Sequence, residues 1–323
     1  MTMTHRAAAL GGALLAAPML AASPAHACAS CGCTLTSDWL SQGLVSQPGT
    51  TVGLRYDYIP QTLLHTDTRA VTDAEKALPN DREIEAYTYN HVVTASIDHQ
   101  FASDWGVNVQ LPIVTRPHRT VTEGETDPSF SRAQGVGDLR ITARWQGLSS
   151  PGRIVGLQAG LVLPTGHFHE AFRSGPEAGN PVDRGLQPGT GTTQVAVGAY
   201  AFGTLAPTVD YIVQVQGQVA LNRRELYKPG ASADISAGLQ YTGWRGITPQ
   251  VEVNFRTSAR DSGDNSDRPN SGGDLLNVSP GLVASISPRV SAYAFMQLPL
   301  YRRVNGFQLV PRFSTSVGLQ LRL

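Results

Sequence analysis

The feature that most constrains the fold of this chain is a two-residue alternation of apolar and polar side chains, which recurs from Thr50 onwards. In the stretch VDYIVQVQGQVALN, Val213 and Val215 fall on one face, whereas Gln214 and Gln216 fall on the other. The stretches DLRITARWQ and QVEVNFR repeat the pattern. Successive side chains of a strand point to opposite faces, so the alternation predicts strands with one apolar and one polar face. Helical periodicity is almost absent, which predicts an all-β fold.

About twelve such strands are expected from these patterns and the turn residues between them. They lie near residues 50–59, 86–100, 105–116, 136–147, 153–164, 192–203, 208–222, 233–243, 247–258, 275–287, 290–302 and 310–323. Tight turns such as ASDW and GWRG alternate with long polar loops. The loops lie at roughly 60–85, 117–135, 165–191, 223–232 and 259–274, with a short one near 303–309.

Short turns at one end and long loops at the other are typical of bacterial outer-membrane barrels, which have an even number of strands. A soluble sandwich also alternates, so the connections decide between the two folds. Lipid cannot satisfy free backbone groups, and a sheet can therefore cross a membrane only when it is closed. We predict a transmembrane antiparallel β-barrel of about 12 strands, with both termini on the short-turn, periplasmic side.

Many polar residues of the predicted strands are charged or carry an amide. Charges in a dry core would each cost several kcal/mol unless paired, whereas a water-filled lumen hydrates them. These side chains are therefore predicted to line a pore. They are Arg55, Asp57, Asp138, Arg140, Arg144, Gln214, Gln216, Gln218, Asp234, Glu252, Arg256 and Arg312.

Aromatic residues gather near the ends of the predicted strands, as Phe101, Trp105, Tyr241 and Trp244 illustrate. Amphipathic rings favour the level of the lipid headgroups, so this placement is expected of an interfacial girdle. The last residues also alternate, although Leu323 stands where outer-membrane proteins usually carry an aromatic residue.

The first residues have the features of an export signal. His5 and Arg6 precede the apolar run 7–22, and Ala25-His26-Ala27 forms a small-residue cleavage site. Residues 1–27 are therefore predicted to be a signal peptide, residues 28–49 a cysteine-containing periplasmic segment, and residues 50–323 the barrel. These features predict the outer membrane of a Gram-negative bacterium as the location.

All three cysteines lie just after this cleavage site, as Cys28, Cys31 and Cys33. The periplasm is oxidising, so a disulfide within a structural plug or tail is one interpretation. Thiolates also suit Cu(I) or Zn(II), although three ligands are one fewer than a closed zinc site needs. Acylation is the third interpretation, and Ala25 and His26 fit its lipobox poorly. The residues leave these alternatives open.

The sequence gives little sign of other functions. Net charge is zero and charged residues make up 15% of the chain, so no nucleic-acid partner is expected. No Gly-x-Ser-x-Gly elbow is present, and the chain is predicted not to be an enzyme, with an outer-membrane hydrolase as a distant alternative. His167 and His169 beside Glu170 could contribute to a surface metal site, but two ligands on a loop rarely suffice.

Several glycine- and proline-bearing stretches carry a family resemblance: GVGDLRITARW, GLVLPTGHF, LQPGTGTTQ, VSPGLVASISPRVSAYAFMQLPLYRRVNGFQL and STSVGLQLRL. Over roughly residues 105–323 the chain resembles the outer-membrane barrel family labelled as a transporter or as a component of the phenol-degradation (MetA) pathway. The resemblance implies a channel that passes small molecules through a polar lumen. The expected partners are outer-membrane lipid, small solutes and the barrel-assembly machinery. The alternative is a barrel scaffold whose periplasmic cysteines handle copper or another soft metal; no other cofactor is expected.

Overall fold

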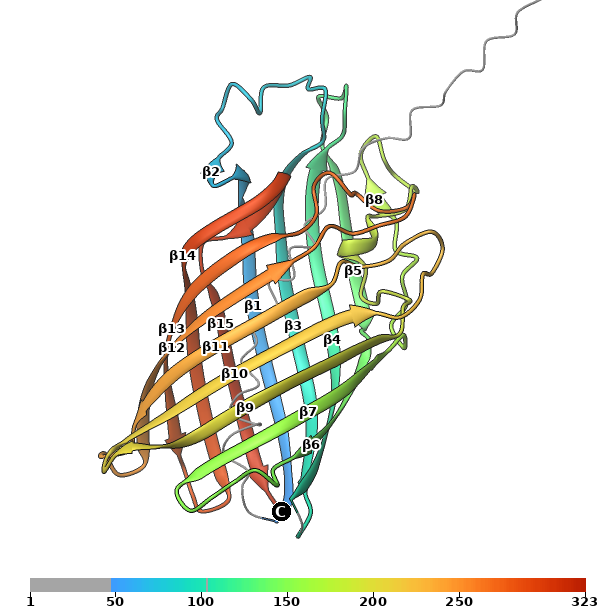
Figure 1. The fold of residues 1–323 in the computed structure, drawn as a ribbon. Helices are drawn as coiled ribbons and strands as arrows, with labels where there is room; N and C mark the ends of the chain where they lie inside the picture. The colour runs from blue at the N-terminus through green and yellow to red at the C-terminus, as the bar shows by residue number, and fades with distance from the viewer. Residues whose placement is uncertain (1–47, 103) are drawn as a thin grey trace, which may run out of the picture.

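The computed structural model describes residues 48–102 and 104–323, which form a closed antiparallel barrel of twelve strands (Figure 1). The described part of the chain contains no helix long and apolar enough to cross a membrane. The barrel strands are β1 (Gly49–Asp67), β3 (Ile84–Gln100), β4 (Trp105–Val121), the interrupted strand β5 (Ser129–Val136) with β6 (Leu139–Trp145), β7 (Arg153–Leu163), β9 (Gln194–Ala206), β10 (Val209–Ala220), β11 (Ser232–Tyr241), β12 (Ile247–Ser258), β13 (Gly273–Ser285), β14 (Val290–Pro311) and β15 (Ser314–Arg322). The loops carry the short strands β2 (Arg69–Ala70) and β8 (Phe172–Ser174) and the 3-10 turn η1 (Arg184–Leu186).

The barrel closes where the first strand meets the last. β1 pairs antiparallel with β15 from Thr51 opposite Arg322 to Tyr58 opposite Thr315, and its other edge pairs with β3. The remaining strands each pair with their sequence neighbours around the ring. The backbone of the spanning strands is therefore hydrogen-bonded on both sides, as a hydrocarbon environment requires.

The connections alternate in length as predicted. The C-terminus lies at the end of the short β3–β4, β6–β7, β9–β10, β11–β12 and β13–β14 turns (Figure 1). The long connections, including residues 68–83, 164–193 and 259–272, lie at the opposite end. We call these the turn end and the loop end. That the turn end faces the periplasm stays a prediction.

Each of the twelve predicted segments overlaps a barrel strand, but the loop end is more regular than expected. β1 and β4 continue beyond their predicted ends, and all of β5 except Val136 lies within the predicted loop 117–135. The inward side chains of β5 include the buried Ser129, Ser131 and Ala133, whereas Arg132 and Gln134 are exposed. Arg132 and Gln134 interrupt an outward face that otherwise carries Phe130 and Val136, so the alternation that identified the other strands is broken here.

The last hairpin turns within the residues assigned to β14. Residues 308–311 pair antiparallel with β1, although residues 290–297 run antiparallel to β15, which itself runs antiparallel to β1. The chain must therefore reverse between these two parts, and Gly306 adopts a φ of 59° there. The reversal falls within the loop that was predicted near 303–309.

The two faces of the wall have opposite chemistry. On β10, Val213 and Val215 are 45% and 47% exposed on the outer face, whereas Gln214 is 7% exposed on the inner face. The outer surface is covered by Leu, Ile and Val side chains, and large exposed rings such as Trp105 and Trp244 lie at the turn end. An apolar exterior around a polar interior is the arrangement that lipid outside and water inside stabilise.

Two neighbouring substitutions test this register. We expect Val215→Arg to cost about 2–4 kcal/mol of refolding stability in lipid vesicles, the penalty for a basic residue near the bilayer midplane. Gln216→Arg should be much milder, because its side chain lines a lumen cavity and loses only the bond from Gln158. Equal losses would indicate that both faces meet the same solvent.

Candidate functional site: the lumen

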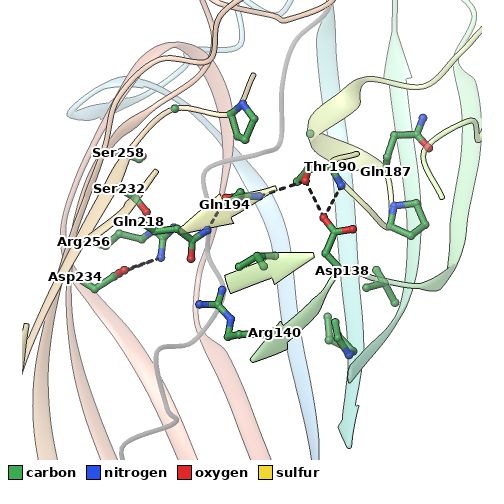
Figure 2. Close-up of a pocket in the computed structure, with 18 of the residues that line it drawn as sticks. Asp138, Arg140, Gln187, Thr190, Gln194, Gln218, Ser232, Asp234, Arg256 and Ser258 are labelled. Carbon is green, nitrogen blue, oxygen red and sulfur yellow. Dashed lines mark hydrogen bonds and ion pairs between the residues drawn. The ribbon is translucent and has the colours of Figure 1, made fainter. Parts of the chain in front are cut away.

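A cavity of about 370 Å³ occupies the loop-end half of the lumen (Figure 2), and we call it the chamber. Its walls are the inward faces of the strands, and parts of the connections 164–193, 221–231 and 259–272 complete it. Most of the side chains predicted to line a pore lie here. They are Arg55, Asp57, Asp138, Arg140, Gln214, Gln216, Gln218, Asp234 and Arg256.

The other three predicted residues lie outside the chamber lining. Arg144 is buried at 1% exposure towards the turn end, where its Nη2 donates to Asp98 Oδ1 at 2.7 Å. Glu252 is buried on the inward side of β12. Arg312 is exposed in the bend between β14 and β15, where the strand alternation is interrupted.

Several polar groups of the chamber are already paired with each other. Arg256 Nη1 donates to Asp234 Oδ1 at 3.0 Å, as Figure 2 shows. Arg55 Nε donates to Asp57 Oδ2 at 2.9 Å. Side-chain amides are paired in the same way, because Gln218 Nε2 donates to the side-chain oxygen Oε1 of Gln194 at 2.7 Å. The lining therefore presents hydrogen-bonding groups and charges of both signs to a solute.

The connection 164–193 folds over the chamber instead of extending away from the barrel. Its residues Arg184, Gln187 and Thr190 are part of the chamber lining. From the wall, Arg116 Nη1 donates to the carbonyl oxygen of Gly185 at 3.0 Å. Arg116 was not among the predicted pore-lining residues, and only its position on the inward face of β4 marks it in the sequence.

The same connection has its own packing. Phe172, Val182 and Leu186 form a buried apolar cluster. The Arg184 guanidinium lies 3.9 Å from the centre of the Phe168 ring and pairs with Glu225 of a neighbouring loop. Burial lowers the pKa of the Arg184 guanidinium, and the Glu225 carboxylate opposes this effect. The connection is thus an ordered part of the lumen.

Asp138 fastens both ends of this connection to the wall. Its Oδ1 accepts the backbone N–H of Gly166 at 3.1 Å, and its Oδ2 accepts the N–H and hydroxyl of Thr190 at 2.8 and 2.7 Å (Figure 2). Beside it, the Thr165 hydroxyl donates to Gly137 O at 3.0 Å and accepts from Leu139 N at 2.9 Å. One carboxylate thus holds segments that enter and leave the loop.

Glycines allow this close approach. Asp138 follows Gly137 in the gap between β5 and β6, where the backbones of Gly166 and Gly189 also meet. A Cβ atom on Gly166 would lie 2.7 Å from Gly189 Cα and 2.9 Å from the Gly137 carbonyl carbon, closer than real contacts. The stretches GVGD, PTGH and QPGT, which carried part of the family resemblance, therefore form a single junction.

Two groups of residues were considered as metal sites, the three cysteines and the pair His167 and His169. Cys28, Cys31 and Cys33 lie outside the described residues, so their chemistry stays a prediction. Within residues 48–102 and 104–323, no group of three or more His, Cys, Asp or Glu side chains could hold a metal ion. His167 Nε2 lies 2.7 Å from Glu170, whereas His169 Nε2 lies 3.3 Å from Glu225, so the two histidines engage separate carboxylates.

Comparisons with known proteins agree on the fold. No family model and no curated protein matches the chain. Among solved structures, it is similar to the COG4313 outer membrane channel from Pseudomonas putida F1, with a TM-score of 0.62 and 13% identity over 86% of this chain and 96% of that one. A weaker likeness is to the translocator domain of the autotransporter NalP from Neisseria meningitidis, with a TM-score of 0.48 and 10% identity over 88% and 93%. The likeness to the COG4313 channel confirms the outer-membrane barrel fold.

The Asp138 anchor can be tested by proteolysis. Asp138→Ala removes three bonds to a carboxylate, and hydrogen bonds to charged groups contribute about 1.5–3 kcal/mol each. We expect trypsin to cleave after Arg184 at least about tenfold faster, since every 1.4 kcal/mol is a factor of about ten. Asp234→Ala is the matched control, because it removes a chamber carboxylate that pairs with Arg256. Equal protection of both variants would contradict the anchor.

Proposed function

We propose that this chain is an outer-membrane channel that passes small molecules through its polar lumen. The observation that carries the proposal is the chamber, a cavity lined by charged and amide side chains inside a closed barrel with an apolar exterior. A passive channel needs no catalytic group, and the COG4313 protein whose fold this chain shares is named as a channel.

The size and charge of the chamber define the kind of solute. Its volume of about 370 Å³ falls at the lower end of small-molecule sites, which span about 300–1,000 Å³. Five arginines and four aspartates line it, so we expect only a weak preference for anions. They are Arg55, Arg116, Arg140, Arg184 and Arg256 with Asp57, Asp138, Asp234 and Asp261.

The resemblance of the sequence to a family labelled for phenol degradation makes a small aromatic molecule one candidate solute within this proposal. The amide and hydroxyl groups of Gln194, Gln218, Ser232 and Ser258 would bind the polar part of such a molecule. Uptake across the outer membrane also fits the predicted signal peptide and the location that it implies.

Planar-bilayer recordings test the channel. The purified protein should conduct ions with weak anion preference, and it should show the heat-modifiable gel migration of a barrel. Arg256→Gln leaves the Asp234 carboxylate without its guanidinium partner, so the reversal potential should shift towards cation preference. Arg245→Gln, on the exposed β11–β12 turn, should not shift it.

Two outcomes would contradict the proposal. A protein that remains soluble without detergent and shows no heat-modifiable migration would not be an outer-membrane barrel. A barrel that migrates normally, yet passes neither ions nor small solutes in bilayers or swelling vesicles, would not be a channel.

A further inference from the structure

An apolar cluster lies among the inward side chains between the chamber and the turn end. Ile212, Val283 and Phe295 are buried against one another, and Phe202 and Tyr293 pack against them. Ile212 belongs to β10, whereas Val283 and Phe295 belong to β13 and β14, and the strands β11 and β12 separate them in the ring. Side chains from strands that are not neighbours can meet in this way only inside the barrel.

The register confirms that these side chains point inward. Ile212 lies two residues from Gln214 on the same face of β10, and Gln214 lines the chamber. Across the sheet, glycines leave room for the large rings. A Cβ atom on Gly281 would overlap the Phe295 ring, and one on Gly318 would overlap the Tyr293 ring. The rings therefore occupy the lumen side of the wall.

A second cavity, of about 240 Å³, lies at the turn end of the lumen. Val283 lines this cavity and also belongs to the apolar cluster. On β10, Ile212 is the inward residue next to Gln214, which lines the chamber. On β11 the inward residue Asp234 lines the chamber and Gln240 lines the turn-end cavity. The apolar cluster thus lies at the level between the two cavities.

We propose that Phe202, Ile212, Val283, Tyr293 and Phe295 form an apolar constriction that limits the passage of ions between the two cavities. This inference rests on the proposed channel function. Apolar side chains cannot replace the hydration shell of an ion, and hydrophobic constrictions in channels act by excluding water. A neutral solute with an apolar face loses little on passing the same surface, because burial of apolar area is favourable. These residues would therefore determine selectivity against small ions, independently of the chamber charges.

Two substitutions at one position separate polarity from size. Ile212→Thr and Ile212→Val both shorten the side chain, and threonine differs from valine by a hydroxyl in place of a methyl group. We expect Ile212→Thr to raise single-channel conductance several-fold in planar bilayers, because its hydroxyl binds water. Ile212→Val should stay close to the unmodified protein. Val213→Thr, on the lipid face of the same strand, is the control and should leave conductance unchanged.

Each result has a distinct meaning once heat-modifiable migration shows that every variant has folded. A rise with threonine alone supports the apolar constriction. An equal rise with threonine and valine would show that only side-chain size matters, and this would overturn it. Unchanged conductance in both variants of a conducting protein would also overturn it, while the channel function would stand. If no variant conducts or passes solutes, the channel function fails as well.

Discussion

The structure depends on the closure of one ring of backbone hydrogen bonds, made where β1 pairs with β15. Within lipid no other partner exists for these groups, so a strand at an open edge would leave a row of unpaired amides. Closure also determines the two faces of every strand. Once the register is set, the face of Val213 meets lipid and the face of Gln214 meets the lumen, and a slip of one residue would exchange them.

Much of this architecture follows from the sequence, because lipid enforces the alternation on which the prediction rests. Val213 and Gln214 could be assigned to opposite faces without any knowledge of tertiary contacts. The apolar–polar alternation is lost where lipid does not impose it. In β5, most of which is predicted to be a loop, the exposed Arg132 and Gln134 lie on the outer side of the strand. Backbone pairing with β4 stabilises this strand even though its alternation is broken.

The residues that face the lumen could be predicted from the sequence, but their contacts with one another could not. Alternation identifies Asp138 as inward, yet its partner Thr190 is 52 residues away and its bonds are partly to backbone, which leaves no trace in sequence composition. Ile212 stands out as an apolar residue on a face of glutamines. Its contacts with Val283 and Phe295 depend on the curvature of the barrel, and local patterns carry no information about curvature.

The glycine junction at Asp138 has a consequence for how such a barrel could diversify. Both ends of the connection 164–193 are fixed at one point of the wall, through Gly166 and Thr190. The span between these two residues can therefore be exchanged, lengthened or shortened without moving the entry and exit points. The strands would keep their register while the insert changed. One barrel could therefore carry different connections between these two anchor points, and each would line the lumen differently.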